Sequence, residues 1–550
     1  MTRLMTFAVL TAWFAAASPA TADEVGELLQ DRIDELLYTG ELSVAGQAIV
    51  SGQLLADIYA QNEFRPLWSA ERTGELIEMI AIGAPAEGLL ARDYHYETLQ
   101  QLLAEQQANP DPLTRANLDL VGTDAIIRIG YHQRFGKVDP SDLDPNVNFR
   151  RELWPDRDPA SAVIGAATST DPLLDIVQGF FPRSYYYVGL RDQLLRHLQI
   201  QADGGWPAVT PGATLRPGDV DPRVVEMRRR LAVTGDLPAG ADLESDTYDA
   251  SLEAAVKVFQ GRHGLDADGI SGAKTFEALN VPVQTRINQL RMSLERLRWI
   301  DQDVTNDFVA VNIPDYRVFL LRDRKIVWSA RAQVGKPYRA TPIFRGDIQY
   351  LELNPTWTVP PGILRNDILP RLKQDPSYVV NKNISVIDRD GRTVDPFSVD
   401  WSKYSRGVPY TLRQEPGPNN ALGRIKFIFP NEHFVFLHDT PSRSLFDRSE
   451  RAFSSGCIRI DKPLELAELL LRDPDNWSQA DLQAVLDSRE TRRVNLKPRE
   501  PVLILYLTAS LDLDGSIRFA KDIYDRDAGL LAALNGPVRL TPPAGVAAAE

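Results

Sequence analysis

Cysteine is almost absent from this chain, which has one cysteine and six histidines in 550 residues. A single thiol cannot form an intramolecular disulfide, so a fold held by disulfides is excluded. The histidines, at positions 95, 132, 197, 263, 433 and 438, show no spacing typical of a zinc module. His433 and His438 lie closest, but residues five apart on a strand face opposite sides. We therefore expect no metal and no cofactor.

Positive charge is also in short supply. The chain has 61 lysines and arginines against 75 aspartates and glutamates, a net charge of −14. A nucleic-acid-binding protein needs a basic face to neutralise phosphates. We therefore expect no nucleic-acid partner.

A long hydrophobic run is missing too. The apolar stretch from Leu4 to about Ala17 follows Arg3 and is too short for a comfortable transmembrane helix. The small residues Ala20-Thr21-Ala22 then form a cleavage pattern, so residues 1–22 are predicted to be a secretory signal, with an uncleaved anchor as the alternative. No cysteine follows that could carry a lipid. We expect a protein secreted across the inner membrane, periplasmic, with no stable membrane span after cleavage.

The one cysteine, Cys457, lies 19 residues after His438. In an oxidising compartment it has no partner in the chain and stays free. The thiolate is the reactive form of cysteine, and a histidine can take the proton from sulfur and return it to a leaving amine. The pair therefore favours a nucleophile and its base. The alternative is a buried structural cysteine with an unrelated surface histidine.

The residues around Cys457 favour the catalytic interpretation. Gly456 allows a sharp backbone turn, so the amides of Gly456 and Cys457 can form an oxyanion hole. Arg459, two residues on, points the same way as the thiol if the segment is extended. It could lower the thiol pKa or hold a carboxylate, or it could be a solvated surface residue.

The segment Ser454-Ser455-Gly456-Cys457-Ile458-Arg459, with His438 upstream, resembles the L,D-transpeptidases with a YkuD-type catalytic domain. The likeness extends over roughly residues 290–530 and includes Asn354-Pro355-Thr356-Trp357-Thr358-Val359-Pro360 and Arg451-Ala452-Phe453. Many members carry a second histidine directly before the Gly-Cys pair. Here Ser455 replaces it, so His438 is the expected base and Ser454, Ser455 and Arg459 are expected to support the site.

The resemblance implies a reaction on peptidoglycan. Cys457 would attack the carbonyl of the third residue of a tetrapeptide stem and expel the terminal D-alanine. An amine of a neighbouring stem would resolve the thioester, giving a 3→3 cross-link, so the expected partners are donor and acceptor stems. The family also implies acylation by carbapenems.

The rest of the chain divides by pattern. Residues 23–205 have apolar residues at helical spacing and, with Phe64-Arg65-Pro66-Leu67-Trp68, resemble the scaffold of the larger family members. Residues 213–282 resemble the three-helix peptidoglycan-binding domain through Phe259-Gln260, Asp268-Gly269 and Thr275 to Leu279. A spacer bundle without affinity is the alternative. In its second helix we expect Ala254, Ala255, Val258 and Phe259 to share the buried side. The tail, 535–550, is predicted to be disordered.

Alternating β-branched and aromatic residues begin near position 305 and predict strands, including one at 433–437 that places His438 at its end. Residues 362–422 break this pattern and are predicted to be a lid, with a passive insertion as the alternative. Trp357, Phe436, Trp401 and Tyr404 are candidate substrate-binding residues. Ordinary core packing is the alternative for Trp357 and Phe436.

Together these features predict a multidomain α+β protein. It has a helical N-terminal scaffold, a small three-helix peptidoglycan-binding domain and a mostly-β L,D-transpeptidase catalytic domain with an inserted lid. The predicted function is a cell-wall-associated L,D-transpeptidase. A cysteine hydrolase of peptidoglycan or of wall-protein linkages and a non-catalytic wall-binding scaffold are the alternatives.

Overall fold

The computed structural model describes residues 19–152, 158–178, 182–405 and 407–540. The chain forms two compact units. Unit 1 takes residues up to 137, 152–181 and 536 onward, and unit 2 takes 138–151 and 182–535. Most of the predicted signal, residues 1–18, and the end of the predicted tail, 541–550, lie outside the described residues. Among the residues described, no helix combines the length and the apolar character needed to cross a lipid bilayer.

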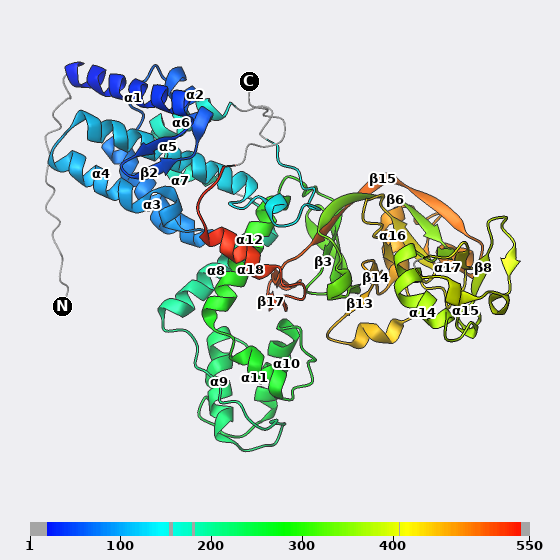
Figure 1. Ribbon diagram of the computed structural model, residues 1–550. Helices are drawn as coiled ribbons and strands as arrows, with labels where there is room; N and C mark the ends of the chain where they lie inside the picture. Colours follow the sequence, from blue (N-terminus) through cyan, green and yellow to red (C-terminus); the bar gives the residue numbers. More distant parts are fainter. Residues whose placement is uncertain (1–18, 153–157, 179–181, 406, 541–550) are drawn as a thin grey trace. The chain divides into compact units, whose positions relative to one another are not determined.

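Unit 1 is helical, as the sequence predicts, with one short hairpin that the pattern did not indicate (Figure 1). Its elements are α1 (Pro19–Thr39), β1 (Leu42–Val44), β2 (Gln47–Ile49), α2 (Gly52–Gln61), α3 (Ala70–Ala86), α4 (Tyr96–Ala108), α5 (Pro112–Phe135), α6 (Pro159–Thr168) and α7 (Leu173–Gln178).

Buried acids on α5 hold unit 1 together. Asp119 accepts the backbone N–H groups of Leu67 and Trp68 at 2.9 to 3.0 Å. Asp124 accepts the hydroxyl of Ser51 at 2.6 Å and lies 2.7 Å from Nε2 of His95. Because the serine and the histidine both bond to the same carboxylate, these three residues form a structural hub and not a proton relay.

Unit 2 holds the remaining elements. Its helices are α8 (Tyr185–Ala202), α9 (Pro222–Thr234), α10 (Ala250–Arg262), α11 (Ala273–Leu279), α12 (Val283–Ile300), α13 (Pro361–Ile363), α14 (Leu369–Leu372), α15 (Ser377–Asn381), α16 (Pro463–Leu471), α17 (Gln479–Ser488) and α18 (Asp527–Asn535). Its strands are β3 (Phe308–Asn312), β4 (Arg317–Arg322), β5 (Lys325–Gly335), β6 (Phe344–Leu353), β7 (Trp357–Thr358), β8 (Ile384–Ile387), β9 (Thr393–Val394), β10 (Thr411–Gln414), β11 (Ile425–Ile428), β12 (Leu437–His438), β13 (Ala452–Ser454), β14 (Ile458–Ile460), β15 (Arg492–Leu505), β16 (Ala509–Leu511) and β17 (Ile517–Phe519).

The predicted scaffold region reaches residue 205, but its last helix belongs to unit 2. Helix α8 packs along α12, and Tyr187, Leu190 and Leu194 are buried in the core shared with the catalytic sheet. The contacts therefore place the division before α8.

Helices α9, α10 and α11 form the small three-helix module that the sequence predicts, with a core of its own. The motif residues hold it together. The side-chain amide of Gln260 donates to Asp268 at 3.0 Å and accepts the Gly269 amide at 2.9 Å. The predicted buried side of α10 is partly wrong. Ala254 and Val258 are exposed, and Leu252, Ala255, Val256 and Phe259 are the buried residues.

In the described part of the chain the catalytic region forms a nine-stranded mixed sheet in the order β13-β5-β14-β12-β11-β6-β15-β3-β4. Strand β4 also pairs with β5, which closes the sheet on itself. Valines and isoleucines such as Val309, Val311 and Ile504 are fully buried inside it. Such β-branched side chains favour strands because they pack well on a pleated surface.

The strand predicted at 433–437 is much shorter than expected, because only Leu437 and His438 form β12. The side chain of Asn431 accepts the backbone N–H groups of His433 and Val435, each at 3.1 Å. The Asn431 side chain therefore binds backbone N–H groups that would otherwise pair with a neighbouring strand. Phe434 also adopts a positive φ of 54°, which interrupts an extended strand. His438 still lies at a strand end, as predicted.

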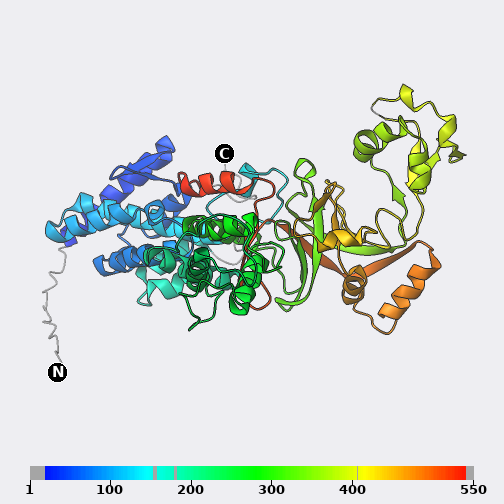
Figure 2. The ribbon, with the colours of Figure 1, turned by 90° about the horizontal axis from the view of Figure 1, so that it is seen from below.

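The predicted insertion, 362–422, folds as a lobe. Figure 2 shows it in yellow and yellow-green. Among the described residues, β10, β8 and β9 of the insertion form a four-stranded sheet with β7, which lies just before residue 362, so the lobe begins earlier than predicted. Helices α13 to α15 cover an apolar cluster that includes Leu364, Val386 and Leu412. Because the lobe has its own core, it is a small subdomain and not an extended loop.

Candidate active site

Two short strands position Cys457 and His438. Strand β12 pairs in parallel with β14, and the register sets His438 beside Arg459. The carbonyl of Phe436 accepts the Ile458 N–H at 3.0 Å, so Cys457, directly before β14, comes beside Phe436. Because residues two apart on a strand face the same side, the thiol and the imidazole share one face of the sheet.

His438 belongs to a row of polar residues that crosses the sheet. Lys426 of β11 pairs with His438, and Glu352 of β6 pairs with Lys426. On the other side, Arg459 pairs with Gln333 of β5. Paired residues face the same side, so the row places two cations, Lys426 and Arg459, on the face of the thiol. Arg459 thus lies in this row, and its role in the site stays a prediction.

The surroundings of His438 make it a neutral base. The side chain is buried, and Nδ1–H donates to the carbonyl of Asp439 at 2.5 Å. A carbonyl only accepts, so the proton sits on Nδ1 and Nε2 is left with a lone pair. Burial, followed by the nearby charge of Arg459, lowers the pKa of His438 to about 3. The imidazole is therefore uncharged at neutral pH.

The thiol of Cys457 is half-buried. Burial raises its pKa, and this outweighs the lowering by the Phe436 backbone and by Lys426 and Arg459. Arg459 thus acts to lower the thiol pKa, as the sequence suggested it could, but desolvation of the thiolate is the larger cause and the pKa is raised overall. The resting pair is a neutral thiol beside a neutral imidazole.

Hydrogen bonds fix the loop that carries the thiol. Gly456 has a φ of 117°, which strains any residue with a Cβ. Its carbonyl accepts the hydroxyl of Thr341 at 2.8 Å. The hydroxyl of Ser454 donates to the carbonyl of Cys457 at 2.5 Å and accepts the Gly456 amide at 3.1 Å. Of the two predicted oxyanion donors, the Gly456 amide is thus engaged by Ser454, and the role of both amides stays a prediction.

An ion pair links this loop to the insertion. Nη1 of Arg339 donates to the hydroxyl of Ser455 at 2.9 Å and to Asp367 at 2.6 Å. Asp367 lies on the short π-helix η4 (Leu364–Ile368) of the insertion. Ser455 therefore connects the nucleophile's loop to the insertion through one arginine.

The four predicted aromatic contacts separate into two groups. Phe436 lies beside the thiol loop, with Nζ of Lys426 at 4.1 Å from its ring. Trp357 and Tyr404 are half-buried against the core of the insertion. Trp401 is 3% exposed, and its indole N–H donates to the Pro396 carbonyl, so the prediction that it offers a surface to substrate is wrong. It is a core residue of the lobe.

Lys426, Arg339 and Thr341 were missed from the sequence. The signal for Lys426 was present, because it is the polar residue between Ile425 and Phe427 in a predicted strand and so faces the opposite side. Arg339 and Thr341 lie more than a hundred residues before Cys457, and nothing local in the sequence indicates their contacts with its loop.

Comparison with known families agrees with this arrangement. A family model described as the L,D-transpeptidase catalytic domain, YkuD, matches residues 306–502. A model of the scaffold domain matches residues 53–194, and one described as "Putative peptidoglycan binding domain" matches residues 220–279. Residues 306–502 are thus similar to an L,D-transpeptidase catalytic domain.

Individual relatives match parts of the chain. It is 38% identical over 248 residues to a protein of Haemophilus influenzae named "Putative L,D-transpeptidase", covering 45% of this chain and 50% of that protein. It is 38% identical over 80 residues to N-acetylmuramoyl-L-alanine amidase CwlM of Mycobacterium tuberculosis, covering 13% and 20%. The chain therefore spans half or less of the length of these relatives.

Two solved structures also match. An L,D-transpeptidase from Mycobacterium smegmatis is 14% identical, with a TM-score of 0.17, over 36% of this chain and 58% of that one. An L,D-transpeptidase from Xylanimonas cellulosilytica, residues 123–326, is 13% identical, with a TM-score of 0.17, over 54% and 99%.

The raised thiol pKa predicts how Cys457 reacts with iodoacetamide. Only the thiolate reacts, so the alkylation rate should stay low through neutral pH and rise to an inflection at a higher pH than that of an ordinary cysteine. Lys426→Gln removes a cation that lowers this pKa and should move the inflection higher. Because the chain has one cysteine, mass spectrometry of the whole protein reports the reaction.

The same protein unfolded in urea is the matched control, in which the inflection should return to about pH 8.5. An inflection near pH 6 in the folded protein would mean that a thiolate and imidazolium pair exists at rest, and would contradict this description of the site.

Proposed function

We propose that the protein is a peptidoglycan L,D-transpeptidase that forms 3→3 cross-links through a thioester on Cys457. The observation that carries the proposal is the shared face of Cys457, neutral His438, Lys426 and Arg459. A nucleophile, a base with its lone pair available, and two cations are the groups that acyl transfer from a carboxylate-bearing peptide needs.

In the acylation step Nε2 of His438 takes the proton of the thiol as sulfur attacks the carbonyl of the third stem residue. The carbonyl oxygen becomes an oxyanion, for which the Cys457 and Gly456 amides are the proposed donors. The carbon–nitrogen bond then breaks, His438 gives the proton to the leaving amine, and D-alanine departs. Because sulfur and imidazole both begin neutral, charge develops only as the reaction proceeds.

In the second step a side-chain amine of another stem attacks the thioester. His438 takes a proton from that amine and returns it to sulfur, which regenerates the thiol and leaves an amide cross-link. Water in place of the amine would give hydrolysis. A covered site that excludes water therefore favours transfer over cleavage.

The two cations of the row suit the charge of the substrate. A tetrapeptide stem carries carboxylates, and the terminal D-alanine carboxylate lies one residue from the bond that breaks. Lys426 and Arg459 also stabilise negative charge on sulfur, since both act to lower the thiol pKa. In a partly buried site such interactions are stronger than in water.

The insertion is the proposed lid. It has a core of its own, and Asp367 reaches the nucleophile's loop through Arg339 and Ser455. A stable lobe tied to that loop by one part-exposed ion pair can move as a unit. The peptidoglycan-associated domains fit a protein of the cell wall, and we infer secretion to the periplasm.

Product analysis tests the proposed reaction. Full-length protein incubated with disaccharide tetrapeptides should release D-alanine and give 3→3 linked dimers, identified by mass spectrometry. Cys457→Ala and Cys457→Ser should lower dimer formation by at least about a thousandfold, because the covalent path is lost. His438→Gln should lower it by about a hundredfold or more.

Circular dichroism checks that these variants stay folded. Tripeptides without dimers would support the hydrolase instead. Dimer formation that continues in folded Cys457→Ala would end the covalent proposal.

Asp367→Asn tests the lid. Removing this carboxylate breaks the ion pair with Arg339 but leaves Cys457 and His438 in place. We expect acylation by a carbapenem to change by no more than about twofold, and dimer formation to fall by about tenfold, because placing two peptide stems needs a covered groove. Intact mass gives the first rate and product analysis the second.

Asp390→Asn is the matched control, an exposed aspartate elsewhere in the same lobe that should leave both rates unchanged. Equal loss of acylation and dimer formation in folded Asp367→Asn would make the segment part of the catalytic core instead of a lid.

A further inference from the structure

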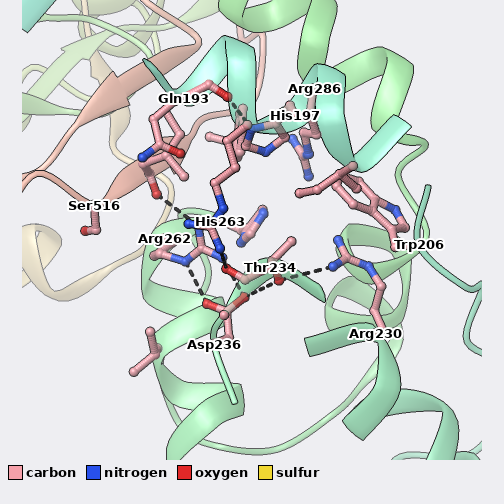
Figure 3. Close-up of a pocket in the computed structure, with 16 residues that line it drawn as sticks. Gln193, His197, Trp206, Arg230, Thr234, Asp236, Arg262, His263, Arg286 and Ser516 are labelled. Carbon is pink, nitrogen blue, oxygen red and sulfur yellow. Dashed lines mark hydrogen bonds and ion pairs between the residues drawn. The ribbon is translucent and has the colours of Figure 1, made fainter. Parts of the chain in front are cut away.

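A cavity of about 190 Å³ lies within unit 2, beside the three-helix module. Helices α9 and α10 form one side, and α8, α12 and the β17 region form the other. Neither Cys457 nor His438 lines it. Figure 3 shows side chains from these separate elements pointing into one space.

The lining of this cavity carries more positive than negative charge. Four arginines line it, at positions 196, 230, 262 and 286. Among the described residues of the lining, Asp236 is the one carboxylate. It accepts two hydrogen bonds from Arg262, at 2.8 and 2.6 Å, and so neutralises that arginine. The other three have no carboxylate in the cavity.

Arg286 is the least satisfied of them. Its side chain is buried, with 7% exposed. Nη1 donates to Gln289 at 2.8 Å, but Nε is buried and has no hydrogen-bond partner among the described residues. Leaving a buried charged donor without a partner costs free energy. Burial and the charges of Arg230 and Arg262 lower the pKa of Arg286 to about 9.

Arg230 is equally enclosed, with 1% exposed. Its guanidinium lies 4.0 Å from the ring of Trp206, and its Nη1 donates to the hydroxyl of Thr234 at 3.2 Å. Burial lowers its pKa to about 9 as well. Figure 3 shows Arg230 and Arg286 at different sides of the space, with His263 between them. Two desolvated guanidinium groups around one space suit an anion with two oxygens.

Two histidines in the lining provide acceptors beside these cations. Nδ1 of His197 donates to the Gln193 carbonyl at 2.7 Å, and Nδ1 of His263 donates to the Phe259 carbonyl at 2.7 Å. Each ring therefore carries its proton on Nδ1, and each Nε2 can only accept. Burial keeps both rings neutral by lowering their pKa, that of His197 to about 4.

An acceptor next to an anion site has a use when the ligand carries an N–H group beside its carboxylate. In an N-acylated amino acid the amide N–H and the carboxylate are attached to the same carbon. Inorganic phosphate also carries an O–H at neutral pH but has no apolar side chain, so it is the competing ligand for this site. The apolar walls, which include Trp206 and Phe519, match a short side chain.

We propose that this cavity binds the terminal carboxylate and adjacent amide of a peptide that ends in D-alanine, as a peptidoglycan stem does. The identity of the peptide rests on the proposed function. The assignment gives the three-helix module a binding site at its border with α8 and α12, apart from the motif residues that hold its fold together.

Calorimetric titration of the full chain tests this with three probes at constant ionic strength: N-acetyl-D-alanine, N-acetyl-D-alaninamide and inorganic phosphate. We expect saturable binding of the acid, with the amide and phosphate weaker by about tenfold or more, because the amide lacks the charge and phosphate lacks the side chain that the apolar walls would contact. Equal affinity for the acid and the amide, or tighter binding of phosphate, would overturn the proposal.

Variants locate the binding. Arg286→Gln and Arg230→Gln should each weaken the acid by about tenfold or more. Arg229→Gln, on the same helix but paired with Glu244 outside the cavity, should leave it unchanged. Binding lost in Arg459→Gln and kept in Arg286→Gln would place the acid at Cys457 and overturn the inference.

Circular dichroism identifies any variant that does not fold, and the comparison of acid with amide on the unaltered protein needs no variant. Acid binding without dimer formation would contradict the proposed function alone. Dimer formation without acid binding would contradict this inference alone.

Discussion

The parallel pairing of β12 with β14 determines which residues lie beside His438 in the candidate site. Leu437 and Ile458 alternate with His438 and Arg459 along the two strands, and both apolar side chains are fully buried. A shift of one residue in either strand would move its apolar side chains out of the core and its site residue into it. Burying one such side chain stabilises the fold by about 1.5–3 kcal/mol. The burial of Leu437 and Ile458 therefore fixes the alignment of His438 with Arg459.

Burial also determines the state of charge. Desolvation lowers the histidine pKa and raises the thiol pKa. The ionic pair is thus disfavoured until a substrate arrives. Lys426 and Arg459 then stabilise the negative charge that develops, without having lowered the thiol pKa overall.

The sequence predicts the parts of the site that are local. Gly456, Cys457 and Arg459 lie within four residues, so their relation follows from backbone geometry, and the lone cysteine is the candidate nucleophile. Helical periodicity and β-branched runs likewise predict the helical, three-helix and sheet regions in chain order. The fold class is confirmed for this reason.

The parts that fail depend on tertiary contacts. Trp401 and Tyr404 lie three residues apart in the same polar stretch of sequence. In the fold the Trp401 indole is buried in the core of the lobe, whereas Tyr404 is only half-buried against it. The sequence shows a cation that can lower the thiol pKa, but the larger effect of desolvation depends on the whole surrounding sheet. Arg339, Thr341 and the arginine cavity join residues far apart in the chain, which no local pattern can indicate.

The central claim is that Cys457 and His438 act as one neutral pair on a peptide stem. Acid-quenched intact-mass spectrometry of the full chain, mixed with a disaccharide tetrapeptide and no acceptor, tests it most directly. The account predicts an adduct equal to the stem minus D-alanine, located on Cys457 and greatly slowed in His438→Gln. Release of D-alanine with no adduct, or an adduct on another residue, would contradict it.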